Sequence, residues 1–270
     1  MPEGDAVWRT ARRLHTGLVG AVLQGSDLRV PELATRDLTG RRTTEVVPRG
    51  KHLLHRLEGG LTLHSHLRMD GSWRVQGVGA RYAAGRRHTT RALLWTDQQV
   101  AIGDRLGVID LVRTEDEDGV VGPLGPDLLD PRFDASTAVA NLLRAPEVPV
   151  SEALLDQRNL AGIGTIWASE PLFVHRISPW RHTGEVGAQA LTELITTTRG
   201  LMVQACRTGR TATAGRTGVG EETWVFARHG MRCHRCGATV AQGSVGRVPR
   251  ERVLSYCPGC QGGLDDLPRA

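Results

Sequence analysis

The stretch CHRCGATVAQGSVGRVPRERVLSYCPGC, residues 233–260, contains two Cys-x-x-Cys pairs separated by twenty residues. Each pair predicts a tight turn that directs two thiolates to the same side, and two such turns supply the four ligands of a tetrahedral zinc ion. Disulfides are the alternative, but nothing in the chain indicates export to an oxidising compartment. Four thiolates leave no open coordination position, so Cys233, Cys236, Cys257 and Cys260 are expected to hold a structural zinc.

The residues between the two pairs predict a β-hairpin. Arg247, Arg250 and Arg252 lie around its turn and its return strand. Guanidinium groups on a zinc-pinned hairpin are suited to holding phosphate. The alternative is an exposed basic turn without a ligand.

Upstream of the hairpin the apolar pattern predicts helices over 136–145, over 151–160, within 161–174 after the loop 161–164, and over 187–206. The loop Gly162-Ile163-Gly164 lies between two of them, where backbone N–H groups can approach a phosphate. A simple helix break is the alternative. The fifth cysteine, Cys206, is expected to pack on the last of these helices.

Residues 43–112 consist of short apolar runs broken by Gly and Asp, which predict an antiparallel sandwich or barrel. Before them, Val7, Ala11, Leu14 and Leu18 recur at helical spacing. Asp5 is expected to cap that helix.

The formal charge of +5 and the pI of about 9.3 are compatible with nucleic-acid binding. Residues 1–56 hold ten Arg/Lys against six acids, and residues 201–260 hold nine Arg against three. Residues 114–134 between them hold seven acids and one Arg. This pattern favours two basic lobes around a polyanion, although scattered solvated charges are an equal alternative. No apolar run of about 18 residues indicates a membrane span, and no export signal is visible, so a cytoplasmic protein is expected.

Two residues carry unusual amines. Lys51 is the single lysine among 34 basic residues, and lysine, unlike arginine, can transfer a proton. Pro2 follows the initiator Met1, whose removal would expose a secondary amine with a pKa of about 7.7–8.0. Glu3 lies beside it and is able to move protons. Each residue has an alternative explanation. Pro2 could serve only to direct removal of Met1, and Lys51 could be a lysine that remains by chance in an arginine-rich chain.

These residues together resemble one family over nearly the full chain. The ordered set is Pro2-Glu3-Gly4, Arg49-Gly50-Lys51, Ser65-His66-Leu67-Arg68-Met69, Gly125-Pro126-Asp127, Leu155-Asp156-Gln157, Gly162-Ile163-Gly164 and the four-cysteine finger. It is similar to the formamidopyrimidine-DNA glycosylase and endonuclease VIII family of base-excision enzymes. The Pro-Glu-Gly start and the short stretch before Trp224 resemble the endonuclease VIII branch.

The resemblance implies an α+β fold. Its expected parts are a catalytic β-sandwich domain with an N-terminal helix at 1–114, a linker at 115–135, a helix–two-turn–helix domain at 136–222 and a zinc finger at 223–262. It also implies damaged DNA as the partner, a monomer, and no small-molecule cofactor.

The resemblance assigns chemistry to four residues. Pro2 would attack C1′ of the damaged nucleotide and form an iminium, with Glu3 as general acid and base. Lys51 would hold phosphate and deliver protons. Arg252 would grip the phosphates of the lesion and assist δ-elimination, as the finger arginine of the family does.

The resemblance also implies DNA contacts from Arg68, Arg105 and Arg250, and from the phosphate site of Gly162, Gly164 and Thr165. Met69 resembles the wedge that fills the gap left by a flipped base, and Leu106 is a second wedge candidate. Core packing is the alternative for both.

Three positions depart from the family pattern. Thr165 stands where the family usually has Asn, Ala6 replaces an acid, and Asp104-Arg105-Leu106 replaces Arg-Arg-Phe. They bear on DNA affinity and on readout of the base opposite the lesion more than on the chemistry.

The expected function is therefore a bifunctional DNA glycosylase and AP lyase that removes oxidised pyrimidines by β,δ-elimination. An oxidised-purine glycosylase is the first alternative. The second is a zinc-containing protein that binds damaged DNA without cutting it.

Overall fold

The structure is a computed structural model that describes residues 2–262 except 217, 219, 247–248 and 250. The chain divides into two compact units, Met1–Pro123 and Leu124–Ala270. Within the described ranges no helix is long and apolar enough to cross a membrane.

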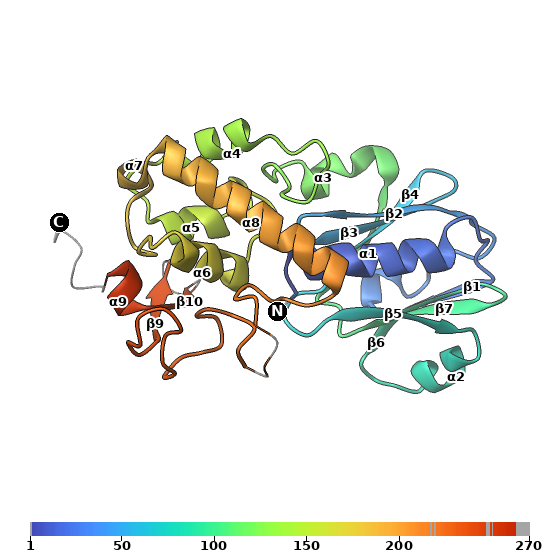
Figure 1. The fold of residues 1–270 in the computed structure, drawn as a ribbon. Coiled ribbons are helices and arrows are strands. Elements are labelled where there is room, and N and C mark those ends of the chain that lie inside the picture. Colours follow the sequence, from blue (N-terminus) through green and yellow to red (C-terminus); the bar gives the residue numbers. More distant parts are fainter. Residues whose placement is uncertain (1, 217, 219, 247–248, 250, 263–270) are drawn as a thin grey trace. The chain divides into compact units, whose positions relative to one another are not determined.

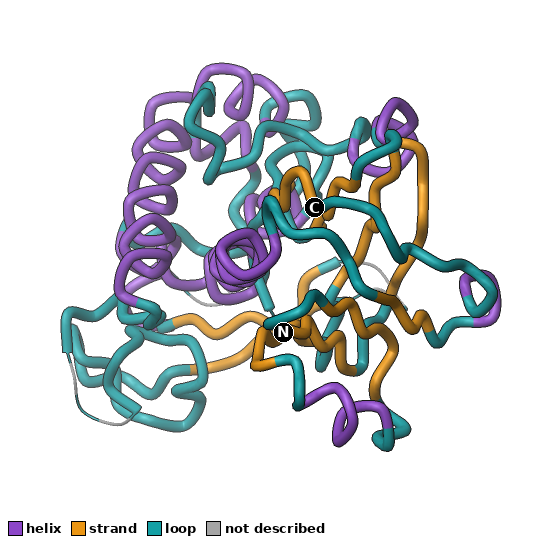
Figure 2. Tube along the Cα trace, turned by 90° about the vertical axis from the view of Figure 1, so that its right-hand side faces the viewer, coloured by secondary structure: helices purple, strands orange, loops and turns teal. Residues whose placement is uncertain are grey.

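The first unit is a β-sandwich of two four-stranded antiparallel sheets (Figures 1 and 2). One sheet has the order β1-β6-β7-β5 and the other the order β2-β3-β4-β8. The strands are β1 (Gly25–Leu28), β2 (Thr43–Arg49), β3 (His52–Leu57), β4 (Leu61–His66), β5 (Ser72–Gly77), β6 (Thr90–Trp95), β7 (Gln99–Asp104) and β8 (Val108–Arg113). The sandwich expected from the short apolar runs is confirmed.

Alternation of side chains along the strands builds the core of this unit. Leu53 and Leu57 on β3, Leu63 on β4 and Ile109 on β8 point inward and are buried together. They pack with residues of the other sheet such as Trp73. Three short helical segments accompany the strands: η1 (Pro31–Leu33), α2 (Ala80–Gly85) and η2 (Thr114–Asp116).

Helix α1 (Gly4–Leu18) contacts β2 of one sheet and β5 and β7 of the other. Its buried face consists of the apolar residues spaced three and four apart, including Val7, Leu14 and Leu18. The expected cap is wrong, because the helix begins one residue before Asp5, which therefore sits in its first turn. There Asp5 is 3% exposed and lies 3.1 Å from Arg9.

The expected linker at 115–135 contains the boundary between the two units, and its first part is helical. The boundary between the units falls after Pro123, and 3-10 helix η2 leads into α3 (Asp118–Val121). Glu117 ties this segment to the sandwich, since Arg56 and Thr62 both donate to its carboxylate. An acidic, Gly-rich stretch is ordered here by a specific ion pair.

The second unit contains helices and a small hairpin (Figure 1). The helices are α4 (Ala135–Leu142), α5 (Val150–Leu155), α6 (Thr165–Val174), α7 (Thr183–Val186), α8 (Ala188–Thr208) and α9 (Pro258–Gln261). They enclose an apolar core that includes Leu154, Trp167 and Leu194. Strands β9 (Ala241–Val245) and β10 (Arg252–Tyr256) form the predicted hairpin, and Leu254 and Tyr256 join it to the same core.

Candidate functional site

Pro2 and Glu3 lie immediately before helix α1. Pro2 is half-buried, whereas Glu3 is 2% exposed and its carbonyl accepts the backbone N–H of Val7. Glu3 has extended backbone angles at the N-cap position. The positive end of the helix dipole therefore faces this segment and favours an anionic group there. A buried carboxyl group immediately after Pro2 is an arrangement suited to proton transfer.

Lys51 lies at the tip of the hairpin between β2 and β3. Arg49 pairs with His52, which leaves Gly50 and Lys51 as a two-residue turn. Gly50 has a φ of +57°, the left-handed conformation that a type II′ turn requires at its first central position. The motif Arg-Gly-Lys thus presents the single lysine on a rigid turn rather than on a long loop.

Three histidines beside this turn were not singled out by the sequence analysis. His52, His64 and His66 lie on the face of the β3–β4–β8 sheet opposite the core, because β3 pairs with β4 in a register that sets His52 across from His66. His52 Nδ1 lies 2.9 Å from His64 Nε2, and His64 Nδ1 lies 3.3 Å from Asp110 Oδ2. The His52 ring stacks on His64 and meets His66 edge-on.

These imidazoles are uncharged at neutral pH. Burial, together with the neighbouring His66, His64, Arg68 and Lys51, lowers the pKa of His52 to about 3. Burial likewise lowers the pKa of His66 to about 4. Positive charge at this end of the sheet is therefore carried by Arg49, Lys51 and Arg68. The pattern His-Ser-His on one strand facing a histidine on the next was the available sequence signal.

Two turns meet at one end of the sandwich. The turn between β4 and β5 carries Arg68 and Met69, and the turn between β7 and β8 carries Arg105. A β-carbon added at Gly71 would lie 3.0 Å from the Arg105 carbonyl oxygen, and one added at Gly107 would lie 2.0 Å from Arg68 Cγ. The two glycines thus allow these turns to pack directly against each other.

The side chains on these turns differ sharply in exposure. Met69 is 64% exposed, which excludes the core-packing alternative for it. Leu106 is 6% exposed and packs in the core beside Trp73, in the space left by the missing side chain of Gly103. The wedge prediction for Leu106 is therefore wrong for this structure.

Both arginines have left-handed backbones. The φ angles of Arg68 and Arg105 are +56° and +49°, a conformation that costs a non-glycine residue of order 1 kcal/mol or more. The backbone N–H of Arg68 donates to His66 Nδ1 at 2.9 Å. This bond fixes the turn and leaves the proton of neutral His66 on Nε2.

The glycine loop of the second unit precedes α6, as predicted. Gln157 organises it: its Oε1 accepts the N–H of Gly162 at 3.0 Å, and its Nε2 donates to the Leu155 and Ile163 carbonyls, each at 2.9 Å. Gly162 has a φ of +102°, which favours glycine. Gly164 is the N-cap and Thr165 the first residue of α6, so the positive end of the helix dipole is presented here.

Glu170 on α6 is a fully buried carboxylate that the sequence did not reveal as such. It accepts the backbone N–H groups of Trp224, Val225 and Phe226 at 2.8–2.9 Å and the hydroxyl of Thr213. The chain after α8 is thereby anchored to the helix. A cavity of about 380 Å³ opens beside this anchor, and Ile166, Arg210, Glu222 and Phe226 are among its lining residues.

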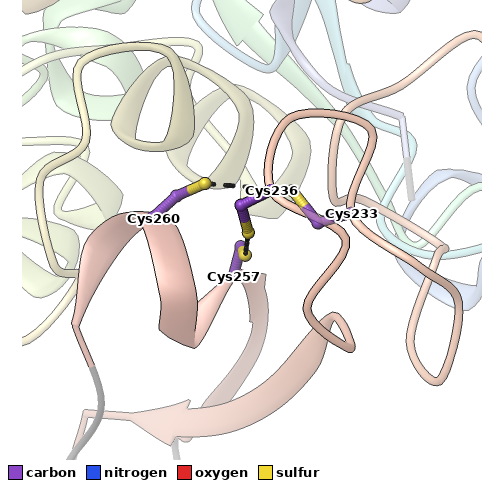
Figure 3. A group of neighbouring side chains, drawn as sticks. All are labelled: Cys233, Cys236, Cys257 and Cys260. Atoms are coloured by element: carbon purple, nitrogen blue, oxygen red, sulfur yellow. Dashed lines mark hydrogen bonds between the residues drawn. The ribbon is translucent and has the colours of Figure 1, made fainter.

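The four cysteines converge as the spacing predicted (Figure 3). Their sulfur atoms all lie within 4.8 Å of one another, with 3.9 Å between Cys233 and Cys260 and 3.4 Å between Cys236 and Cys257. A tetrahedral zinc with Zn–S bonds of about 2.3 Å needs sulfur separations of roughly 3.8 Å. Burial raises the pKa of Cys260 to about 11, so a metal ion would displace a proton on binding. The cluster fits a structural metal with four sulfur ligands.

Of the hairpin arginines, Arg252 is exposed at the start of β10. Arg247 and Arg250 lie outside the described residues. The site residues expected from the sequence are divided between the two units. The first unit contains Pro2, Glu3, Lys51, Arg68, Met69 and Arg105. The second unit contains the glycine loop, Arg252 and the cysteine cluster.

Comparison with known proteins assigns both units to domains of the same family. Residues 1–106 match the formamidopyrimidine-DNA glycosylase N-terminal domain, and residues 124–217 match the formamidopyrimidine-DNA glycosylase H2TH domain. The chain is 48% identical over 269 residues to a probable endonuclease 8 2 of Streptomyces coelicolor, covering 99% of this chain and 96% of that protein.

Two further relatives extend the comparison. A DNA-(apurinic or apyrimidinic site) lyase Nei2 of Mycolicibacterium smegmatis is 38% identical over 261 residues, covering 97% of this chain and 99% of that protein. The fold matches a Lactococcus lactis formamidopyrimidine-DNA glycosylase bound to DNA with an AP site, with a TM-score of 0.81 at 23% identity, covering 97% of this chain and 100% of that one. The chain therefore belongs to the formamidopyrimidine-DNA glycosylase and endonuclease VIII family of DNA-repair glycosylases and AP lyases.

Proposed function

We propose that the protein is a bifunctional DNA glycosylase and AP lyase that removes oxidised pyrimidines from DNA. The observation that carries this proposal is the position of Pro2 and Glu3 immediately before α1, with Glu3 buried. The chain that carries them belongs to a family of DNA glycosylases and AP lyases. Endonuclease 8 proteins are the relatives with 48% and 42% identity.

The chemistry begins once Met1 has been removed. The secondary amine of Pro2 forms a bond to C1′ of the damaged nucleotide while the bond from C1′ to the base breaks. The base leaves with the electron pair of that bond and takes up the proton that the Pro2 nitrogen loses. Glu3 protonates the ring oxygen of the sugar, the ring opens, and C1′ becomes an iminium carbon. This cation draws electrons from the neighbouring C2′–H bond, so a base can take that proton and the 3′ phosphate leaves.

A second elimination releases the 5′ phosphate, and water then hydrolyses the iminium to return the amine. Lys51 holds a phosphate and supplies protons at the sugar or base. Arg252 holds the phosphates beside the lesion, as a guanidinium fork allows. The Gly162, Gly164 and Thr165 segment at the start of α6 holds a further phosphate through its backbone N–H groups.

The damaged nucleotide reaches the amine by leaving the base stack, and Met69 fills the gap that it leaves. The 64% exposure of Met69 on a rigid turn supports this role. The preference for pyrimidines is supported by the short segment between α8 and Trp224. Its two ends are joined, because the backbone N–H groups of Thr213 and Ala214 both donate to the Glu222 carbonyl.

The cysteine cluster holds one zinc ion whose role is structural. It fixes the turns that flank β9 and β10 and thereby the hairpin that carries Arg252. No step of the reaction passes through the metal.

The test is a borohydride trap on duplex DNA with an abasic site, using protein whose N-terminus is verified by mass to begin at Pro2. We expect a covalent protein–DNA adduct and strand cleavage. Tight binding of the abasic duplex without cleavage or adduct would instead show a non-cutting binding protein. Excision rates on thymine glycol and 8-oxoguanine duplexes then separate the two glycosylase classes, and faster excision of 8-oxoguanine would contradict the pyrimidine preference.

A further inference from the structure

The first unit has a strongly basic segment that lies apart from the residues already discussed. Residues 71–96 contain five arginines and no acidic residue. The helix α2 lies in the middle of this segment, and Ala84 packs it against Leu93, Val100 and Ile102 of the sheet.

The sheet register shows where the end of this segment lies. Asp104 pairs with Ser72 on β5 and with Thr90 on β6, so the start of β5, the start of β6 and the end of β7 share one end of the sheet. Arg86 and Arg87 lie four and three positions before the start of β6, and Arg87 is tied to Asp104 at that end. The backbone N–H of Arg105 donates to the Thr89 carbonyl at 2.8 Å, which joins this segment to the turn of Arg105.

The groups at this end carry an excess of positive charge. The turns and strand ends gathered there carry seven arginines and three acids: Arg29, Arg68, Arg74, Arg86, Arg87, Arg91 and Arg105 against Asp27, Asp70 and Asp104. Asp27 is paired with Arg29 at 2.6 Å, and Arg29 also donates to the Arg87 carbonyl. Asp104 is shared between Arg74 at 3.1 Å and Arg87 at 3.7 Å. Arg86 and His88 are exposed, and the side chain of Arg87 is 54% exposed. The basic rim, defined as Arg86, Arg87 and the two turns with Arg68 and Arg105, thus borders the exposed Met69.

We propose that Arg86 and Arg87 bind backbone phosphates of the DNA duplex that flanks the lesion. This inference rests on the proposed function and extends its DNA contacts beyond the damaged nucleotide. A wedge at Met69 can enter the duplex only if the strands on either side are held, and guanidinium forks on a rigid sheet end suit that task. Phosphate contacts carry no sequence information, so the contribution is the same for damaged and undamaged DNA.

The test measures how DNA affinity depends on salt. Each phosphate contact adds about 0.9 to the slope of log K against log salt. We therefore expect Arg86→Gln/Arg87→Gln to lower the slope by about 1 to 2 between about 50 and about 200 mM salt. The probes are a duplex with an uncleavable tetrahydrofuran abasic analogue and the same duplex without damage, and both should lose the same amount.

Arg12 and Arg13 on α1 provide a matched control, because they are also adjacent and exposed in the same unit. Arg12→Gln/Arg13→Gln removes the same charge and should leave the slope unchanged. Arg86→Lys/Arg87→Lys keeps the charge and should restore the slope, which also guards against misfolding of the glutamine variant. The single-turnover elimination rate at saturating enzyme should be the same in the wild type and in the Arg12→Gln/Arg13→Gln control.

Equal slopes for the wild type and Arg86→Gln/Arg87→Gln would overturn this inference, as would an equal loss in the Arg12/Arg13 variant. The proposed function would survive that result if the wild type still cleaves abasic DNA. A wild-type protein that neither cleaves nor traps abasic DNA would overturn the proposed function itself.

Discussion

His55 is a neutral base in the core of the sandwich. It is 4% exposed, and its Nε2 lies 2.9 Å from the hydroxyl of Thr43. Burial lowers the pKa of His55 from 6.5 to about 4. The unfolded chain therefore binds the proton first as the pH falls, so the stability from this group is complete above pH 6.5 and decreases below it.

We predict that His55 alone makes the wild type roughly 2 kcal/mol less stable at about pH 5 than at about pH 7.5. His55→Gln can retain the bond to Thr43 but cannot titrate, so it should lose this part of the pH dependence. Urea unfolding at the two pH values measures the effect, with His88→Gln as the exposed control. An unchanged pH dependence in His55→Gln would show that folding does not lower the pKa of His55.

The sequence shows which residues carry a chemical group more reliably than it shows whether their side chains face the solvent or the core. Lys51 and the four cysteines stand out in the sequence because rarity and spacing are visible in the chain, and the four cysteines do cluster. Leu106 and Asp5 were misassigned because one residue of difference in a turn or at a helix start decides whether a side chain faces solvent or core. That choice depends on the space beside Gly103 and on the salt bridge to Arg9, which are set by tertiary packing.

At the scale of elements, Glu170 connects α6 to the chain that follows α8. Its partners lie 43 to 56 positions further along, so no local pattern could reveal them. A buried carboxylate that accepts three backbone N–H groups loses its charge and part of its geometry when replaced by an amide.

We predict that Glu170→Gln lowers the free energy of unfolding of the second unit by roughly 2 to 4 kcal/mol. The backbone N–H groups of Trp224, Val225 and Phe226 should exchange with deuterium much faster than in the wild type. Glu193→Gln, an exposed change of the same kind on α8, is the control. If exchange at these three residues stays as slow as in the wild type, Glu170 does not anchor the segment.

The zinc hairpin gives the second prediction at this scale. Cys257→Ser removes one of four ligands, so the purified protein should contain much less than one equivalent of zinc, and the 233–260 segment should lose its protection from proteolysis. Cys206→Ser changes the cysteine outside the cluster and should retain the metal. Elemental analysis and limited proteolysis compare the two, and full zinc content in Cys257→Ser would contradict the proposed ligand set.

At the scale of the whole molecule, the sequence predicted the sandwich, the helical part and the zinc hairpin, because each has a distinct period or spacing. It missed the basic rim, since Arg68, Arg86 and Arg105 come together only through the strand register. The boundary after Pro123 falls within the expected linker, but the sequence did not show that Arg56, about sixty positions earlier, holds the acidic stretch before it. Both features depend on pairs of residues that are far apart in the chain, and composition does not reveal such pairs.

The central claim concerns which amine reacts, and the chain offers two, the α-amine of Pro2 and the side chain of Lys51. Protein beginning at Pro2 would be trapped on abasic DNA with borohydride, digested, and the modified peptide mapped by mass spectrometry. We predict that the adduct lies on the N-terminal peptide, and that Pro2→Gly, which replaces the secondary amine by a primary one, and protein that retains Met1 still bind DNA but trap poorly. An adduct on the Lys51 peptide, or full trapping with Met1 in place, would contradict the account.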